Sequence, residues 1–223
     1  MKGKVVEVFE SYQGEGLYFG QRQVFVRLFG CNIGCKFCDT KVDYYFECEP
    51  EELFKKIVPF KKSYRFISFT GGEPLTQKDF LKEALILGHK HGFKNYLDTN
   101  GTLPEALEEV IAEVDIVAMD FKLPSSTGEG NFWEQHRRFL KISSIQDCFV
   151  KAVICLSTTE EDLRQALKLI KEGDHNTALV LQPNSFEPQK ELLEKVSRYQ
   201  AICASAGVVS CVIPQMHRIL GIM

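Results

Sequence analysis

Three cysteines lie within one stretch of eight residues, at Cys31, Cys35 and Cys38, with three and then two residues between them. Three thiolates at this spacing can hold one inorganic centre. A closed structural zinc or iron-sulfur site takes four protein ligands, and no fourth Cys or His completes a tight motif nearby. The spacing therefore predicts a metal cluster with one open coordination position, which is the arrangement of a catalytic centre.

Two other interpretations of the cysteines stay open at this point. A free cysteine is often a small buried apolar residue, and a structural zinc site can be completed by a distant His or Cys. The neighbours favour a cluster, because Gly30 and Gly34 allow the loop to fold tightly and Phe37 precedes the last cysteine. The other five cysteines lie in helical or strand-like surroundings and are expected to be structural or incidental: Cys48, Cys148, Cys155, Cys203 and Cys211.

The composition is that of a globular protein. With 223 residues, of which 44% are hydrophobic, the chain can form a sizeable core, and we expect a single domain over residues 1–223. The net charge of -3 and the absence of a long Lys or Arg block give no reason to expect a nucleic-acid partner. No apolar run approaches the roughly 20 residues needed to span a membrane. Without an N-terminal signal segment, a reducing cytoplasm is the expected compartment.

The elements that must position the cysteines alternate between strand-like apolar runs and helical patterns, which predicts an α/β fold with a mainly parallel sheet. Strands are predicted at residues 24–29, 66–69, 95–98, 115–119, 149–154, 178–181 and 208–213. Helices are predicted at residues 50–58, 79–91, 104–112, 132–141, 160–171 and 188–204. The helix at 160–171 has the clearest start, with Thr158 and Glu161 as a capping box. About six strand-helix units are too few for a closed eight-unit barrel, so an incomplete βα barrel is predicted.

Polar segments follow the predicted strands where such a sheet binds its ligand, outside the carboxyl ends of the strands. These segments are the cysteine loop, Thr70–Glu73, Asp98–Asn100, Asp120–Lys122 and Gln182–Asn184. Their shared position predicts an active site at one rim of the sheet. The alternative is that Gly, Asn and Pro merely end the strands, and without the cysteines it would account for most of these loops.

The cysteine loop, followed one strand later by Gly71-Gly72-Glu73-Pro74, resembles the signature of the radical S-adenosylmethionine (SAM) superfamily. The resemblance implies that three thiolates hold a [4Fe-4S] cluster, whose remaining iron is chelated by the amino and carboxylate groups of SAM. The cofactor would carry the radical chemistry, while the protein supplies position and electrostatics. Glycine backbone could approach the cofactor closely, with Glu73 as an acceptor for its ammonium group. A simple turn after a strand is the other interpretation of these four residues.

Further residues narrow this resemblance to the 7-carboxy-7-deazaguanine synthase family, whose members convert 6-carboxy-5,6,7,8-tetrahydropterin to 7-carboxy-7-deazaguanine, with release of ammonia, in queuosine and 7-deazapurine biosynthesis. The matching segments are Glu7-Val8-Phe9, Gln13-Gly14-Glu15-Gly16, Arg27, Cys38-Asp39-Thr40 and Pro214-Gln215-Met216-His217. They run from close to the N-terminus to close to the C-terminus. The similarity therefore extends over nearly the whole chain.

The resemblance implies a role for each matching residue. The expected substrate contacts are Tyr12, Gln13, Gly14, Glu15, Arg27, Thr70 and His217. The expected SAM contacts are Phe37, Cys38, Asp39, Gly72, Glu73, Asp120, Phe121, Lys122, Gln182, Pro183 and Asn184. Arg27 would hold the substrate carboxylate through a bidentate pair. Thr40 matches the family's magnesium position, where a hydroxyl oxygen suits a hard cation.

Four of these roles stay open. Thr40 can equally cap a helix, and His217 can be an ordinary surface residue. Relatives often carry Ser-Pro-Lys where this chain has Asp120-Phe121-Lys122, which leaves the contacts of Asp120 and Phe121 in question while the lysine is retained.

The resemblance also implies Mg²⁺, a homodimer, and an electron donor such as flavodoxin or ferredoxin. One alternative function is an activating enzyme that generates a glycyl radical on a partner protein. Such an enzyme would share the cysteines and the Gly-Gly-Glu-Pro segment, but it would have no use for Arg27 beside Gln13 and Glu15. A non-catalytic zinc module is the alternative from another class of protein.

Overall fold

The computed structural model describes residues 1–38, 42–173 and 177–221. Within these residues nine strands form one sheet, in the order β3-β1-β2-β4-β5-β6-β7-β8-β9. The parallel strands are β2 (Arg22–Leu28), β4 (Phe66–Gly71), β5 (Lys94–Thr99), β6 (Ile116–Asp120), β7 (Asp147–Ile154), β8 (Leu179–Pro183) and β9 (Ser210–Val212). At one edge, β1 (Gly3–Tyr12) pairs antiparallel with β2 and with β3 (Phe46–Cys48).

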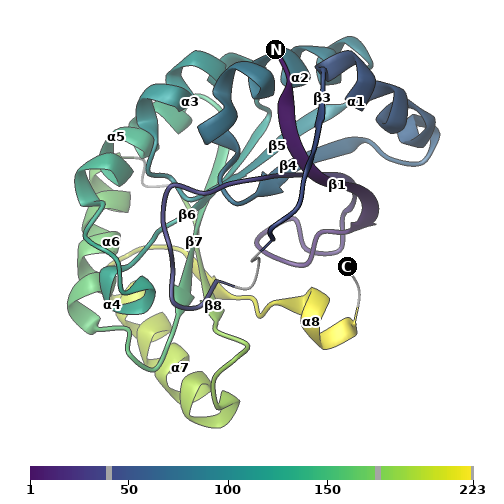
Figure 1. The fold of residues 1–223 in the computed structure, drawn as a ribbon. Coiled ribbons are helices and arrows are strands. Elements are labelled where there is room, and N and C mark those ends of the chain that lie inside the picture. Colours follow the sequence, from purple (N-terminus) through teal and green to yellow (C-terminus); the bar gives the residue numbers. More distant parts are fainter. Residues whose placement is uncertain (39–41, 174–176, 222–223) are drawn as a thin grey trace.

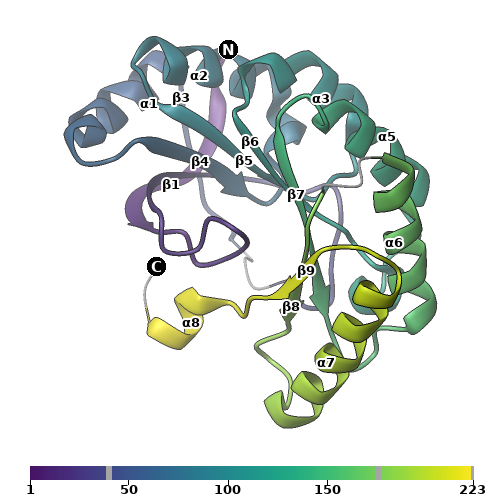
Figure 2. The same cartoon turned by 180° about the vertical axis from the view of Figure 1, so that it is seen from behind.

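Helices cover the convex outer side of this curved sheet, as Figure 1 shows. The helices are α1 (Pro50–Ile57), α2 (Lys78–Lys90), α3 (Pro104–Val110), α4 (Pro124–Thr127), α5 (Trp133–Ser143), α6 (Glu160–Gly173), α7 (Gln189–Ser205) and α8 (Met216–Leu220). The loop after β1 and the short helix α8 lie instead on the concave side, in both views of the molecule (Figures 1 and 2). The predicted incomplete βα barrel is confirmed.

The two faces of the sheet differ because successive strand residues point to opposite sides. On β2, Val24, Val26 and Leu28 belong to the large apolar core beneath the helices. Phe25 and Arg27 alternate with them and face the concave side. Each strand therefore gives apolar side chains to the helices, while its other face is available for a site.

A second, smaller apolar cluster covers part of the concave side of the sheet. Its buried members are Phe66, Tyr96, Ile116, Ala118, Phe149 and Val180, with Tyr18 packed against them. On four strands, the residue two positions after a cluster member is polar and lines a pocket: Asp98, Asp120, Lys151 and Gln182. A polar layer therefore sits directly above an apolar one, towards the carboxyl ends of the strands.

The start of helix α6 differs from its predicted capping box. The hydroxyl of Thr159 accepts from the backbone N–H of Asp162 at 3.2 Å. The hydroxyl of Thr158 instead accepts from the N–H of Cys155 at 2.8 Å, inside the preceding turn. The cap is therefore one residue later than predicted, and the Thr158–Glu161 box was wrong.

The other differences from prediction concern the ends and edges of the sheet. Strands β1 and β3 were not predicted, nor were the short helices α4 and α8. The predicted helix at 50–58 is helical to Ile57 and continues as a 3-10 turn over Val58–Lys62. Within the described ranges, no helix combines the length and apolar character that crossing a bilayer requires.

Candidate active site

A pocket with a volume of about 260 Å³ lies at the carboxyl ends of the parallel strands. All five polar segments that follow predicted strands contribute to its wall. The predicted site residues that line it are Tyr12, Gln13, Gly14, Glu15, Arg27, Cys31, Cys35, Phe37, Cys38, Thr70, Gly72, Asp120, Lys122, Gln182, Asn184 and His217. Three predicted site residues are described but do not line it: Glu73, Phe121 and Pro183. The predictions for Asp39 and Thr40 fall outside the described residues.

The three cysteines of the loop line this pocket as reduced thiols, with Cys35 buried and Cys31 and Cys38 exposed. Burial raises the pKa of the Cys35 thiol to about 11, and coordination by a metal would deprotonate it. In the described part of the chain, no three His, Cys, Asp or Glu side chains are arranged as ligands of one metal ion. Three thiols that share a pocket suit a cluster of several iron atoms.

Asn100, directly after β5, ties the cysteine loop to the sheet. Its side-chain N–H groups donate to Asn32 Oδ1 at 2.8 Å and to Cys31 Sγ at 3.8 Å. Its Oδ1 accepts from the Thr102 hydroxyl at 2.6 Å. Its carbonyl oxygen accepts from His136 Nε2 at 3.3 Å, and burial lowers the pKa of His136 to about 3, so this imidazole is neutral. A cysteine of the loop is thus held by a residue whose own polar groups are occupied.

The glycine pair of the Gly-Gly-Glu-Pro segment is required by the protein's own packing. Gly71 has a φ of +131°, and a Cβ there would lie 2.1 Å from the carbonyl oxygen of Leu28. A Cβ on Gly72 would lie 2.0 Å from the carbonyl oxygen of Gly30. The sequence suggested that these glycines admit a cofactor. The structure gives them an additional reason, because the segment packs directly on the chain that enters the cysteine loop.

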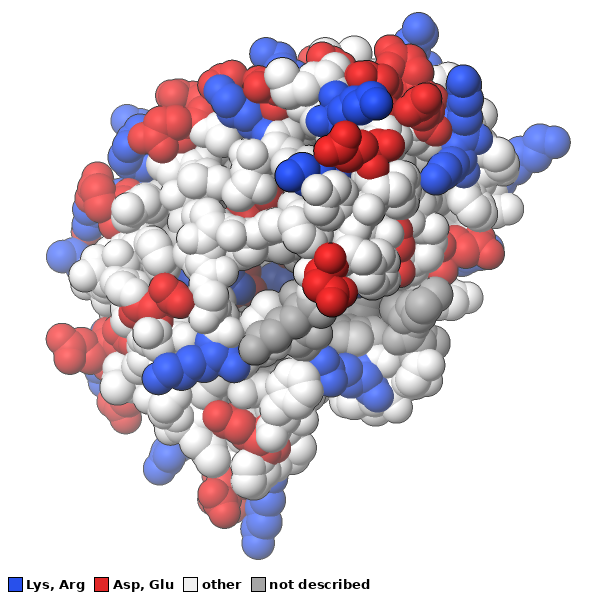
Figure 3. Space-filling model, viewed as in Figure 1, with Lys and Arg blue, Asp and Glu red and all other residues white. Residues whose placement is uncertain are grey.

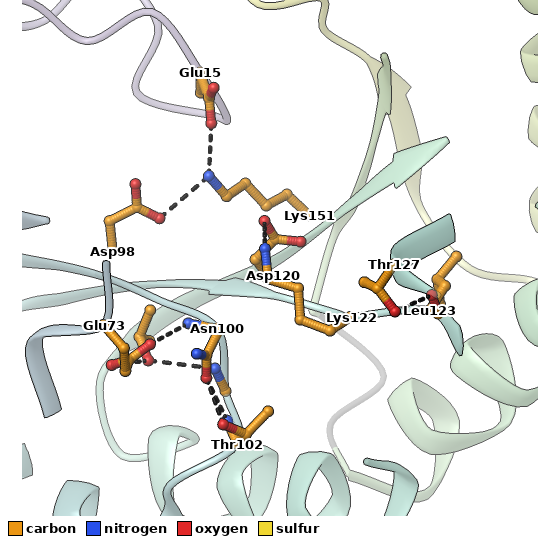
Figure 4. Close-up of polar contacts among 12 residues, drawn as sticks. Glu15, Glu73, Asp98, Asn100, Thr102, Asp120, Lys122, Leu123, Thr127 and Lys151 are labelled. Atoms are coloured by element: carbon orange, nitrogen blue, oxygen red, sulfur yellow. Dashed lines mark hydrogen bonds and ion pairs between the residues drawn. The ribbon is translucent and has the colours of Figure 1, made fainter. Parts of the chain in front are cut away.

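The Glu73 carboxylate does not reach the pocket. It is fully buried and accepts from Leu75 N at 3.0 Å, Thr99 Oγ1 at 2.9 Å and Asn100 N at 2.7 Å (Figure 4). Burial raises its pKa to about 7, although the three donors act in the opposite direction. The sequence predicted an acceptor for an ammonium group of SAM. The structure instead uses this carboxylate to join the Gly-Gly turn to the end of β5.

Lys122 and Asp120 form a buried ion pair on the pocket wall, with 2.7 Å between Nζ and Oδ2 (Figure 4). Burial alone would lower the pKa of Lys122, but the charges of Asp120 and Cys35 raise it to about 12. Asp120 Oδ1 and Gln182 Oε1 are buried without a hydrogen-bond partner among the described residues. Because both side chains line the pocket, these two oxygens fit a polar ligand such as SAM.

Phe121 points away from this wall, towards helix α5. Its ring stacks on the imidazole of His136, with 4.8 Å between the ring centroids. It is almost fully buried, and its backbone N–H donates to the carbonyl oxygen of Lys151 at 2.7 Å. The structure therefore does not bring the Phe121 side chain to the site. Its ring packs against α5, and its backbone N–H is bonded to β7.

Lys151 is a pocket residue that the sequence analysis missed. Its ammonium group contacts Glu15 Oε2 at 2.6 Å and Asp98 Oδ1 at 3.2 Å (Figure 4). Burial alone would raise the pKa of Glu15, but the charge and hydrogen bond of Lys151 and a bond from Gln215 lower it to about 2. Burial raises the pKa of Asp98 despite the same lysine. The available signal was a lysine within the apolar run 149–154.

Two segments from opposite ends of the chain close the pocket. The N-terminal hook, residues 13–21, meets the C-terminal segment where Met216 N donates to the Gly14 carbonyl at 2.9 Å. A Cβ on Gly14 would lie 2.7 Å from His217 Cβ, so these two residues are in close contact. Gln215 Nε2 donates to Glu15 Oε1 at 3.1 Å. The structure therefore brings His217 to the pocket beside the hook.

Arg27 stands at the pocket wall on β2. Its Nε donates to Glu7 Oε1 at 2.7 Å, and its guanidinium carbon lies 5.7 Å from the ring centroid of Phe9. Both partners are on the neighbouring strand β1, so the unpredicted β1 orients the guanidinium group. On the face seen in Figure 3, acidic and basic side chains are intermingled, which gives that face no broad field of one sign.

The chain is similar to known proteins over nearly its whole length. Residues 26–170 match the Radical SAM superfamily. A 7-carboxy-7-deazaguanine synthase of Geobacter sulfurreducens is 35% identical, over 96% of this chain and 96% of that protein. One of Methanothermobacter thermautotrophicus is 31% identical, over 100% of this chain and 98% of that protein. The crystal structure of QueE from Escherichia coli has the same fold, with a TM-score of 0.69 at 21% identity over 95% of this chain and 93% of that one.

Proposed function

Because the chain belongs to the radical SAM superfamily and, within it, to the 7-carboxy-7-deazaguanine synthase family, we propose that it converts 6-carboxy-5,6,7,8-tetrahydropterin to 7-carboxy-7-deazaguanine, with release of ammonia. One observation carries the proposal beyond family membership. The three cluster cysteines share a single pocket with Arg27 and with the N-terminal hook. A cluster, SAM and a small anionic substrate would therefore meet in one place.

The superfamily implies a [4Fe-4S] cluster and SAM, and the residues present fit both. Cys31, Cys35 and Cys38 would bind the cluster, and SAM would lie along Gly72 and the Asp120–Lys122 pair. When bound, the cluster and SAM supply the radical chemistry that removes hydrogen from the substrate. The protein's part is to bind, to orient and to exclude water. The two unpartnered oxygens on Asp120 and Gln182 support a donor-bearing ligand at this wall.

The other end of the pocket suits a carboxylated pterin. Arg27 offers a planar guanidinium for the substrate carboxylate, and its contact with Glu7 fixes the orientation of that group. At this end Glu15 and Asp98 share a single buried lysine, Lys151. The resulting excess of acceptors suits the amino and ring N–H groups of an aminopyrimidinone.

The remaining assignments follow from the family alone and complete the proposal. Magnesium would bind near Thr40 and contact the substrate. A small redox protein such as flavodoxin or ferredoxin would supply the electron. The enzyme would act as a homodimer in the cytoplasm, with residues 1–223 as one domain.

The decisive assay is anaerobic. Protein with a reconstituted cluster is incubated with dithionite, SAM, Mg²⁺ and the tetrahydropterin, and the deazaguanine product and SAM cleavage are both measured by mass spectrometry. We expect both. Cleavage of SAM without deazaguanine would refute the substrate assignment and leave the superfamily assignment intact.

Replacing Arg27 separates this function from glycyl-radical activation, which no observation here favours. Arg27→Ala should abolish pterin turnover while SAM cleavage by dithionite-reduced protein continues, because the arginine contacts the substrate end of the pocket. Arg27→Lys is the matched control and should retain part of the turnover, since it keeps the charge but loses the bidentate geometry. Full pterin turnover by Arg27→Ala would contradict the assigned role.

A further inference from the structure

Lys151 is a buried lysine at the centre of the polar layer. It lies in strand β7, between Val150 and Ala152, which belong to the core beneath the helices. Its side chain is only 6% exposed, and its ammonium group contacts both Glu15 and Asp98. Burying a lysine is unfavourable unless its charge is paired. Two carboxylates from distant parts of the sequence therefore converge on this one cation.

Each of these carboxylates is also held at its second oxygen. Glu15 Oε1 accepts from Gln215 Nε2 at 3.1 Å. Asp98 Oδ2 accepts from the Thr70 hydroxyl at 3.3 Å. A continuous path of polar contacts thus runs from β4 through β5 and β7 to the N-terminal hook and the C-terminal segment. Lys151 is the middle of this path, so its removal would break the polar link between Glu15 and the sheet.

We propose that Lys151 is a positioning residue for the substrate: its ammonium group fixes the Glu15 and Asp98 carboxylates and thereby holds the start of the N-terminal hook over the strand ends. This role rests on the proposed function, because the donor-rich edge of a pterin is the ligand that these carboxylates would meet. Lys151 acts through Glu15 and Asp98 and does not touch the reacting atoms.

The part of the hook around Tyr18 has its own contacts with the sheet, so loss of Lys151 should affect only the start of the hook. The Tyr18 hydroxyl donates to Asp147, and its ring lies edge-on to Tyr96 with 5.7 Å between centroids. A Cβ on Gly16 would lie 2.5 Å from the Phe149 ring, so the chain is packed tightly there. The Gln13 backbone is tied to this part as well, because its N–H donates to the Gln21 carbonyl at 2.8 Å and its carbonyl accepts from Gly20 N at 2.9 Å. Loss of Lys151 should therefore loosen residues 14 and 15 and leave residue 13 and residues 16–21 in place.

The first test uses hydrogen-deuterium exchange on cluster-free protein, so that it does not depend on turnover. Lys151→Met should speed exchange of the amides of residues 14 and 15 by about tenfold or more, because a hydrogen bond to a charged group is lost. Residues 16–21 should keep their protection. Lys151→Arg should preserve the protection of residues 14 and 15. Lys168→Met, on the exposed side of α6, is the matched control and should change neither region.

Lys151→Met leaves two buried carboxylates without their cation, so a second variant guards against simple misfolding. Lys151→Met with Glu15→Gln removes one of those charges. If Lys151 acts on the hook through Glu15, the double variant should loosen residues 14 and 15 no more than Lys151→Met alone. Additive loosening would overturn the role, because it would mean that the two residues act independently.

Steady-state kinetics of the loaded enzyme then separates positioning from chemistry. Lys151→Met should raise the KM for the pterin by about tenfold or more, with SAM cleavage in the absence of pterin unchanged, and Lys151→Arg should restore most of the affinity. An unchanged KM with a protected hook would overturn the role. The role would also be overturned if Lys151→Arg protected the hook from exchange but had no turnover. The lysine amine would then be needed for the reaction itself and not for positioning. If the wild type makes no deazaguanine but Lys151→Met still loosens the hook, the proposed function fails and Lys151 remains the anchor of the hook.

Discussion

The buried carboxyl group of Glu73 should make the protein less stable as the pH rises towards neutrality. Its pKa in the folded protein is raised from the ordinary 4.5 to about 7. Between these values the folded state binds more protons than the unfolded state, so the free energy of unfolding falls as the pH rises. The separation of the two pKa values corresponds to about 3 kcal/mol, an order-of-magnitude figure. Glu73→Gln removes this titration.

The measurement compares the two proteins by urea unfolding of cluster-free material between pH 4.5 and 8, under reducing conditions. Near pH 4.5 the stability difference between the two proteins is the reference, and it includes the loss of a bond from Asn100 N, Thr99 or Leu75 N that a Gln amide nitrogen cannot accept. By pH 8 the variant should have gained about 3 kcal/mol relative to the wild type, measured from that reference difference. Glu161→Gln, on the exposed face of α6, is the control for the background pH dependence.

The opposite slope would refute this reasoning. Three donors contact the Glu73 carboxylate, and bonds of this kind favour its charged form. If they outweighed burial, the folded pKa would lie below 4.5, and Glu73→Gln would become less stable relative to the wild type as the pH rises. A stability difference that does not change with pH would equally refute it, because burial and the three donors would then offset each other.

Three further predictions follow from single contacts. Gly72→Ala should destabilise the fold by about 2 kcal/mol or more, because its Cβ would lie 2.0 Å from the Gly30 carbonyl oxygen; Gly130→Ala, which meets nothing within 4 Å, should unfold like the wild type in the same urea titration. Cys35→Ser should lower the iron and sulfide content after reconstitution and abolish SAM cleavage; a full complement of both would contradict the ligand assignment. Burial acts against a charged His89, but two neighbouring carboxylates raise its pKa above 6.5, so its stabilising contribution should be present below pH 6.5 and lost as the pH rises through the folded value. The unfolding free energy of His89→Gln should not show this fall with rising pH. If the variant and the wild type had the same pH profile of stability, the pairs of His89 with Glu113 and Asp115 would contribute nothing.

The alternating pattern of the sequence was enough to predict the parallel sheet and the rim at which the site lies. It failed at β1, because that strand has no helix to alternate with and is defined by pairing at the sheet edge. The Gly-Gly-Glu-Pro motif located Glu73 but not the direction of its side chain, which depends on Thr99 and Asn100. Lys151 was missed because Glu15, its partner, lies 136 residues away. Contacts between elements that are far apart in the sequence could not be predicted, because local sequence patterns carry no information on them.

The register of the sheet links the fold to the site more closely than either motif does. Asp120 on β6 pairs directly with Lys151 on β7, and Val153 on β7 with Gln182 on β8. Side chains alternate between the faces, so a slip of one residue would turn Lys151 towards the apolar core beneath the helices. Such a slip would also bring core residues such as Val150 to the pocket. The burial that drives folding therefore enforces the polar layer, and a substitution that shifts the strands should impair the site before it unfolds the protein.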